Sequence, residues 1–168
     1  MQRRNFFKNL TQSFNNKPKQ ILIRPPYFNN EEDFSRCIEC EGICAQKCEE
    51  GIITLLEDKT PVLDFEQSGC TFCDVCALEC PEDVLHVKYK NNIDITIEID
   101  KLKCMSWSKN ICFSCKDPCL DNAIEFTGMF YPEIIADRCT SCGFCIKYCP
   151  TEAIIIKPKI KELVDENS

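Results

Sequence analysis

Residues 139–150 read Cys139-Thr-Ser-Cys142-Gly-Phe-Cys145-Ile-Lys-Tyr-Cys149-Pro150, which is the spacing C-x2-C-x2-C-x3-C-P. This spacing is typical of bacterial segments that hold four-iron, four-sulfur clusters, in which three cysteines bind one cluster and the fourth binds a second. The same spacing, including the proline, occurs earlier in the chain at Cys70, Cys73, Cys76, Cys80 and Pro81. Two unmodified copies predict a protein built around iron–sulfur clusters.

Cysteine accounts for 16 of the 168 residues, a content that calls for a chemical explanation. A secreted disulfide scaffold fits poorly, because no secretory signal precedes four tight groups that would each have to pair outward. Structural zinc uses cysteine pairs separated by a longer loop, often with histidine, and this chain has one histidine. Iron–sulfur ligation is the preferred interpretation, with zinc and disulfides as the alternatives.

From Cys37 onward the sequence is a fourfold repeat. The leading cysteines are Cys37, Cys70, Cys104 and Cys139, which are 33, 34 and 35 residues apart. Each unit continues through a tight turn to an apolar pair; the pairs are Ile52-Ile53, Val84-Leu85, Ala123-Ile124 and Ala153-Ile154. Alternating and β-branched residues then predict strands over residues 61–65, 95–99 and 133–136.

One such unit is too small to bury a core, whereas two units can do so if each gives its fourth cysteine to the other's cluster. The sequence therefore predicts an α+β fold of two tandem bacterial 2[4Fe-4S] ferredoxin-like modules, with short β-hairpins and short helices around the clusters. We expect an N-terminal arm over residues 1–33, modules over 34–90 and 91–156, and a C-terminal tail over 157–168.

The exchange of fourth cysteines assigns four ligands to each of four clusters. The first cluster takes Cys37, Cys40, Cys44 and Cys80, and the second takes Cys70, Cys73, Cys76 and Cys48. The third takes Cys104, Cys112, Cys115 and Cys149, and the fourth takes Cys139, Cys142, Cys145 and Cys119. His86 is expected to be a strand residue and not a ligand.

The first run is irregular, because it has one extra residue before Cys44 and Glu49 in place of the proline. The distance from the leading cysteine to the apolar isoleucine or leucine is still 15 residues in units one, two and four, so the repeat stays in register. Gly42 gives the altered loop conformational freedom. We expect the first cluster to be the most labile.

The third run is C-x7-C-x2-C-x3-C, with a long first loop, residues 105–111, that holds the only tryptophan. One interpretation makes this loop a docking lid over the third cluster. The other makes it a packed surface loop in which Trp107 shields the cluster from water and thereby tunes its potential.

The formal net charge of −7 argues against nucleic acid and anionic membranes as partners and favours a basic protein surface. No glycine-rich phosphate loop or nucleophile–base arrangement is visible, so no catalytic residue is assigned and we do not expect an enzyme. No stretch approaches the length of a transmembrane helix. Arg3 and Arg4 resemble a twin-arginine export signal, but the required apolar segment does not follow them, and we expect a cytoplasmic protein.

These features together resemble the NapF-type ferredoxins that accompany periplasmic nitrate reductase. The resemblance rests on Arg3-Arg4-x-Phe6, Arg24-Pro25-Pro26-Tyr27, Phe34-x-x-Cys37, the two regular runs, and the third run from Cys104 to Cys119. It implies a cytoplasmic protein with four [4Fe-4S] clusters that binds the molybdenum-containing catalytic subunit and assists its maturation before export. An electron-transfer ferredoxin, or a ferredoxin-like subunit of an oxidoreductase complex that meets a redox partner protein, is the alternative.

Overall fold

The computed structural model describes residues 22–159, so most of the expected arm and the end of the expected tail lie outside the described residues. Its elements follow the chain as η1 (Glu31–Glu39), α1 (Ile43–Gln46), β1 (Ile53–Leu55), β2 (Pro61–Leu63), α2 (Val75–Leu78), η2 (Val87–Tyr89), β3 (Ile95–Ile99), β4 (Ile124–Thr127), β5 (Phe130–Ile134), α3 (Phe144–Lys147) and β6 (Ile154–Pro158). These short helices and hairpins confirm the predicted α+β class.

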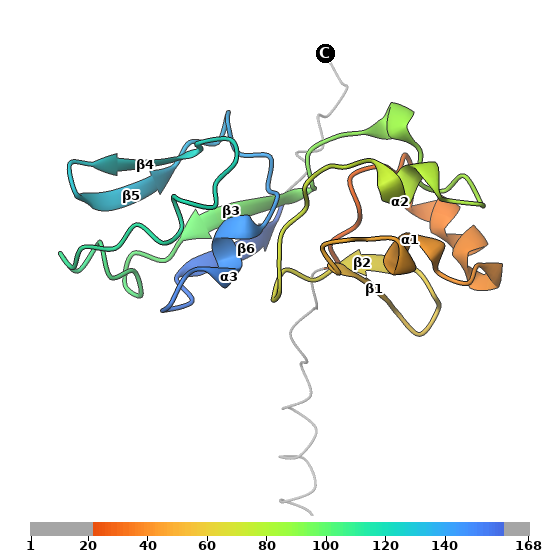
Figure 1. Ribbon diagram of the computed structural model, residues 1–168, viewed down its shortest axis with the longest axis horizontal. Helices are drawn as coiled ribbons and strands as arrows, with labels where there is room; N and C mark the ends of the chain where they lie inside the picture. The colour runs from red at the N-terminus through yellow and green to blue at the C-terminus, as the bar shows by residue number, and fades with distance from the viewer. Residues whose placement is uncertain (1–21, 160–168) are drawn as a thin grey trace, which may run out of the picture.

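Figure 1 shows two halves side by side, which we call the first half (residues 22–90) and the second half (residues 91–159). The first half contains η1, α1, α2 and the β1–β2 hairpin, and the second contains α3, the β4–β5 hairpin and the β3–β6 pair. Each sheet has two antiparallel strands. Such small sheets cannot form a core alone, so the cysteine-rich loops packed on them complete each half.

The apolar pairs of the repeat form the buried centre of each half. All eight of these residues are buried: Ile52, Ile53, Val84, Leu85, Ala123, Ile124, Ala153 and Ile154. In three units the second residue of the pair begins a strand, namely β1, β4 or β6. In the first unit this residue, Ile53, is 16 residues after Cys37, whereas Ile154 is 15 residues after Cys139, so the expected common spacing of 15 is wrong and the extra residue of the first run is not compensated. The second unit differs, because its pair leads into His86 and the turn of η2.

His86 is extended, with φ −145° and ψ 137°, but it precedes η2 and lies in no strand. Its Nδ1 accepts a hydrogen bond from the amide of Lys88 at 3.0 Å, which turns the chain away from a strand course. The expectation that His86 is a strand residue is therefore wrong, because its side chain accepts a local hydrogen bond from the backbone of Lys88.

The second half is closed by a regular strand ladder. β3 pairs with β6 over five residue pairs, from Ile95 opposite Pro158 to Ile99 opposite Ile154. Ile95 and Ile97 are buried on one face of β3 while Thr96 is exposed, as the alternation in the sequence predicts. The ladder also takes in two residues that were expected in the tail.

The predicted strand over residues 133–136 is displaced toward its hairpin turn. β5 begins at Phe130, because Gly128, with φ 63°, reverses the chain immediately after β4. The register shifts between Phe126 and Thr127, and the ladder ends at Ile134. β2 is likewise shorter than predicted and ends at Leu63.

The first half is closed by residues 22–27 without a regular ladder. Their carbonyls accept three separate hydrogen bonds: Leu63 N to Ile23 O at 2.7 Å, Asn91 N to Pro26 O at 2.9 Å and His86 N to Tyr27 O at 2.8 Å. Pro25 and Pro26 have no N–H to donate, so this segment cannot form a two-sided ladder. Ile23 and Tyr27 are buried, and this part of the expected arm belongs to the core.

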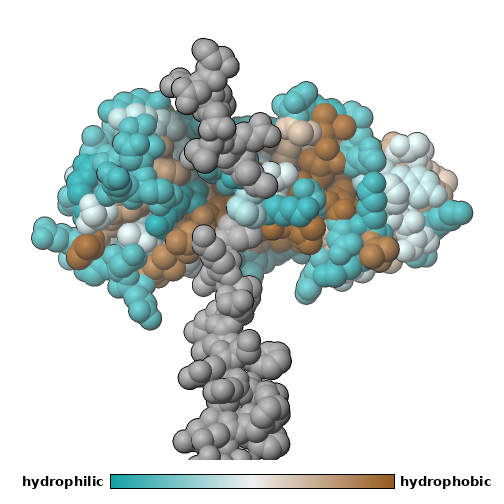
Figure 2. Space-filling model, turned by 180° about the vertical axis from the view of Figure 1, so that it is seen from behind, coloured by the Kyte–Doolittle hydropathy of each residue, from teal (hydrophilic) through white to brown (hydrophobic). Residues whose placement is uncertain are grey.

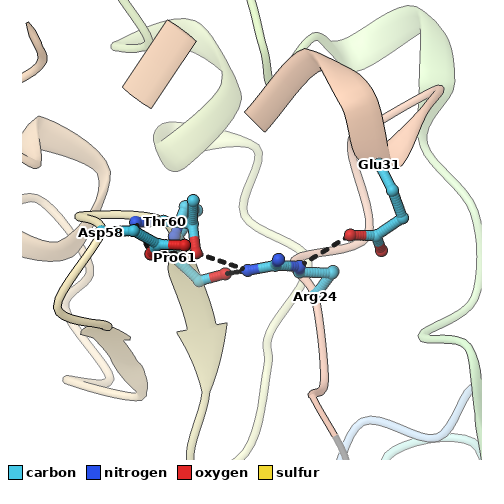
Figure 3. A network of polar contacts seen from close by, with 5 residues as sticks. All are labelled: Arg24, Glu31, Asp58, Thr60 and Pro61. Atoms are coloured by element: carbon cyan, nitrogen blue, oxygen red, sulfur yellow. Dashed lines mark hydrogen bonds and ion pairs between the residues drawn. The ribbon is translucent and has the colours of Figure 1, made fainter. Parts of the chain in front are cut away.

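Arg24 fixes that segment to β2 and η1 (Figure 3). Its Nε donates to Glu31 Oε2 at 3.1 Å, and one terminal nitrogen donates to Thr60 Oγ1 at 3.0 Å and Pro61 O at 2.9 Å. Thr60 Oγ1 in turn donates to Asp58 Oδ1 at 2.8 Å. The Arg24 side chain is only 10% exposed, so this network sits at the edge of the core and is partly shielded from water.

Candidate iron–sulfur sites

The three short helices share one local construction. A left-handed residue precedes each: Gly42 (φ 72°), Asp74 (φ 66°) or Gly143 (φ 88°). The second residue of each helix is then the third cysteine of its run, and these cysteines, Cys44, Cys76 and Cys145, are buried. In the first run the extra residue, Glu41, lies before the left-handed glycine, so the helix and its cysteine keep their places.

The second group of cysteines faces one cavity. This cavity is lined by Cys48, Cys70, Cys73 and Cys76, together with Tyr27, Ile52 and Leu63. Cys48 comes from the first run and the other three come from the second run. The structure thus brings together the four residues that the exchange of fourth cysteines assigns to the second cluster.

The second half repeats this arrangement twice. One cavity is lined by Cys104, Cys112, Cys115 and Cys149, and another is lined by Cys119, Cys139, Cys142 and Cys145. In each case three cysteines come from one run and one from the other. Both groups match the expected third and fourth ligand sets.

The cysteines of the first group lie close enough together to shift one another's pKa values. Burial raises the pKa of Cys37 to about 11, and the neighbouring thiols of Cys80 and Cys40 contribute to that rise. Burial likewise raises the pKa of Cys44 to about 11, followed by the effect of Cys80. Cys80, from the second run, therefore lies beside the cysteines of the first run.

Backbone amides point at several of the sulfur atoms. Ala123 N donates to Cys119 Sγ at 3.2 Å, and Ala153 N donates to Cys149 Sγ at 3.1 Å. In the second unit the donor is the second residue of the pair, because Leu85 N donates to Cys80 Sγ at 3.5 Å. These donors come from the buried apolar pairs, so the same residues form the core and stabilise a thiolate.

The chemistry of the cysteine groups is suited to binding an iron–sulfur cluster. Burial raises the pKa of the Cys76 and Cys115 thiols to about 12 and raises the pKa of Cys145, so a thiolate there needs a positive partner, which iron supplies. Within residues 22–159, no three His, Cys, Asp or Glu side chains are close enough to hold a single metal ion. A four-iron cluster bonds each thiolate to a different iron, so its ligands are more widely spaced. The assignment of individual cysteines to clusters remains a prediction.

The sequence did not indicate the roles of three residues around the second cavity, namely Tyr27, Asp74 and Lys90. Tyr27 Oη accepts a hydrogen bond from Asp74 N at 3.2 Å, and Lys90 Nζ donates to Asp74 Oδ1 at 2.7 Å and to Phe72 O at 3.0 Å. The hydrogen bond from Lys90, and then that from Tyr27, lowers the pKa of the Asp74 carboxyl. Tyr27 stands out in the sequence as part of Arg24-Pro25-Pro26-Tyr27, but nothing there indicates that it contacts the second run.

The long third loop packs on the β4–β5 hairpin. Trp107 Nε1 donates to Pro132 O at 3.1 Å, its ring meets Tyr131 edge-on at 5.1 Å, and Lys101 Nζ lies 4.1 Å from its centroid. Met105, from the same loop, lines the third cavity, whereas Trp107 does not. Trp107 thus holds the loop in place, and it is Met105 that borders the cavity.

Comparison with known proteins agrees with this geometry. A family model described as a 4Fe-4S dicluster domain matches residues 36–84, and one described as a 4Fe-4S binding domain matches residues 132–155. Within the described part of the chain, no helix is long and apolar enough to cross a membrane.

Three relatives illustrate the family. The chain is 31% identical over 137 residues to the ferredoxin-type protein NapF of Escherichia coli K12, covering 79% of this chain and 82% of that protein. It is 30% identical over 149 residues to the NapF of Haemophilus influenzae, covering 83% and 81%. It is 27% identical over 170 residues to the methylamine utilization ferredoxin-type protein MauM of Methylorubrum extorquens, covering 88% and 76%. The chain therefore belongs to the ferredoxin-type 4Fe-4S proteins of the NapF family.

Proposed function

We propose that this protein carries four [4Fe-4S] clusters, binds the catalytic molybdoenzyme subunit of periplasmic nitrate reductase in the cytoplasm, and assists its maturation before export. The observation that carries the proposal is the match to NapF over 79% of the chain, combined with four cysteine groups. The relatives support the part of the proposal that makes this chain a ferredoxin-type iron–sulfur protein. The partner follows from the resemblance of the Arg24–Tyr27 segment and the long third run.

One cluster is placed at each cysteine group, with the ligand sets expected from the sequence. A bound [4Fe-4S] cluster stores and returns one electron. The chain's own part is to present the thiolates, to donate amide hydrogen bonds to sulfur at Cys80, Cys119 and Cys149, and to exclude water. The buried pairs Ile52-Ile53 and Ala153-Ile154 line the second and third cavities and exclude water from them.

The surface supports docking to a basic partner. Glu31, Glu32 and Asp33 form an acidic first turn of η1, the helix that also contains Cys37 of the first run. Figure 2 shows hydrophilic residues on both flanks of one face and apolar residues gathered near its middle. With a net charge of −7, attraction to a basic surface should weaken as salt is added.

A second function, that of an electron carrier, is favoured by one specific contact. The amide of Cys70, in the second cysteine group, donates to the carbonyl oxygen of Cys142, in the fourth group, at 2.7 Å. A maturation factor does not need its two halves joined through their cysteine loops, whereas a carrier of electrons between two surfaces does.

The two functions are separated by an anaerobic pull-down with the tagged full-length chain, with iron and sulfide counted on the same sample. The comparison variant lacks residues 1–21, because a longer deletion would remove Ile23, Arg24 and Tyr27 from the core of the first half. A second variant reverses the charge of the acidic turn, with Glu32 and Asp33 each changed to Lys; Glu31 is kept because it pairs with Arg24.

Recovery of the unprocessed molybdoenzyme subunit, with about four clusters' worth of iron on the bait, supports the maturation role. Loss of recovery in the truncated variant alone would mean that residues 1–21 bind the subunit. Loss of recovery in the charge-reversed variant alone would mean that η1 binds it. Full iron with no such subunit recovered in any cofactor state would contradict the maturation role and leave electron transfer.

A further inference from the structure

The two halves meet through their cysteine loops. The hydrogen bond from Cys70 N to Cys142 O, at 2.7 Å, joins backbone atoms of two cysteines that line different cavities. Cys70 borders the second cavity and Cys142 borders the fourth. These two sites therefore share a direct peptide contact although they belong to different halves.

Two glycines make this close approach possible. A Cβ on Gly69 would lie 2.5 Å from the backbone nitrogen of Phe144, and a Cβ on Gly143 would lie 2.4 Å from the ring of Phe65. Gly69 and Phe65 belong to the first half, while Gly143 and Phe144 belong to the second. The packing is reciprocal, because each half presses an aromatic residue against the glycine that adjoins the other half's cysteine.

The same two cysteines also open onto one shared hollow. An open hollow between the halves is lined by Cys70, Phe72 and Lys90 on one side and by Leu120, Asp121 and Cys142 on the other. Lys90 is the residue that holds Asp74 in the second run, and Asp121 Oδ2 accepts from Thr140 Oγ1 at 2.6 Å in the fourth run. The hollow is therefore bounded by the polar groups that position both cysteine loops.

We propose that the contact between Cys70 and Cys142 makes the second and fourth sites a coupled pair that conducts electrons between the halves. An electron that leaves one of these sites reaches the other, so that one site is oxidised as the other is reduced, with no proton or further reactant needed. Gly69, Gly143, Phe65 and Phe144 are positioning residues for this pair. The four sites are then connected in the order first, second, fourth, third. This inference rests on the proposed occupancy of the sites.

The test compares two matched variants of the full chain by electron paramagnetic resonance after anaerobic reduction. Cys40→Ala, Cys44→Ala, Cys112→Ala and Cys115→Ala together take two ligands from each of the first and third sites and leave the second and fourth. Cys73→Ala, Cys76→Ala, Cys142→Ala and Cys145→Ala together take two ligands from each of the second and fourth sites and leave the first and third. Two cysteines are changed at each site because a site that keeps three can still hold a three-iron cluster.

The inference predicts a spectrum split by spin–spin interaction in the variant that keeps the second and fourth sites. The variant that keeps the first and third sites should give signals without that splitting. Unsplit signals in the first variant, at full iron for two clusters, would overturn the coupling but leave the four-cluster proposal standing. Less iron than two clusters require would instead overturn the proposed ligand sets, and the coupling with them.

A second measurement probes the contact without touching any cysteine. Gly69→Ala, added to the variant that keeps the second and fourth sites, should reduce the splitting because a Cβ would collide with Phe144. Gly51→Ala is the control: its φ of 64° makes alanine locally strained, but no atom lies within 4 Å of the position that a Cβ would take. Splitting unchanged by Gly69→Ala, at equal iron, would contradict the positioning role of this contact.

Discussion

The two halves hold the same kind of cysteine groups but close their folds in different ways. In the second half, the first and last strands, β3 and β6, pair over five residues. In the first half the equivalent position is taken by residues 22–27, where Pro25 and Pro26 exclude a ladder and three isolated hydrogen bonds are made. Side chains, above all Arg24 and Tyr27, replace the missing ladder.

The repeat keeps the cysteine sites in both halves but does not keep the strands. The buried apolar pair after each run is kept in all four units, and its amide reaches a cysteine sulfur in units two, three and four. Beyond that pair, each half is free to complete its fold by whatever the flanking sequence provides. Mutations should therefore act through different groups in the two halves.

The largest expected effect is on the ladder of the second half. Ile97→Ala removes a buried side chain from the centre of β3 and should lower the free energy of unfolding of this half by about 3 kcal/mol. The visible absorbance of the clusters, followed in urea under anaerobic conditions, measures it. Thr96→Ala, on the exposed face of the same strand, should change the midpoint little. Equal effects of the two substitutions would show that the ladder does not support the core.

Arg24→Ala should be the strongest single substitution in the closing segment of the first half. It leaves Thr60 Oγ1 and Pro61 O without their donor and removes the guanidinium that lies 4.3 Å from the Phe34 ring centroid. We expect a loss of about 2 kcal/mol, seen as earlier bleaching of the clusters in urea. Arg138→Ala is the control, because its ion pair with Glu125 is exposed and should contribute under about 1 kcal/mol. If both arginines behave alike, the comparison between the halves fails.

A smaller effect is expected at the second site. Tyr27→Phe keeps the ring but removes the oxygen that accepts from Asp74 N, at a cost of about 1 kcal/mol. Because Asp74 precedes α2, cluster loss should begin at the second site, which selective paramagnetic resonance of the reduced protein can follow. Tyr131→Phe, which keeps its ring contact with Trp107, is the matched control in the second half. A shift of equal size in both variants would argue against a specific role for Tyr27.

The smallest effect is expected from the ion pair across the β3–β6 ladder. Lys157 Nζ meets Glu98 Oε2 on the surface, with both side chains about half exposed. Lys157→Ala should lower stability by under about 0.5 kcal/mol, and added salt should remove even that difference. A larger loss in thermal unfolding would mean that the strand pair depends on its charges and not on its buried isoleucines.

Much of this fold could be predicted because the cysteine spacing and the apolar pairs are local signals. The α+β class, the burial of all four pairs and the bounds of β3 follow from residues close together in the sequence. The strand over residues 133–136 was misplaced because the hairpin turn at Gly128 decides where β5 begins, and strand propensity does not. His86 was misassigned because its side chain bonds the amide two residues on.

The contacts between distant segments could not be predicted in the same way. Arg24 and Tyr27 are recognisable as a motif, but their partners Thr60 and Asp74 lie far along the chain. The meeting of Gly69 with Phe144 likewise depends on how the halves dock. The only local hint is that glycine adjoins a cysteine in both loops, which on its own indicates a tight turn and not an interface.

The most direct test of the account is a count of iron, acid-labile sulfide and zinc on the full chain, reconstituted anaerobically and freed of unbound metal. Four cysteine groups that each hold a [4Fe-4S] cluster predict about sixteen iron and about sixteen sulfide per chain, with zinc absent. A chain that binds zinc in place of iron, or that saturates at about eight iron, would contradict the central claim that each pair of cysteine runs builds two cluster sites.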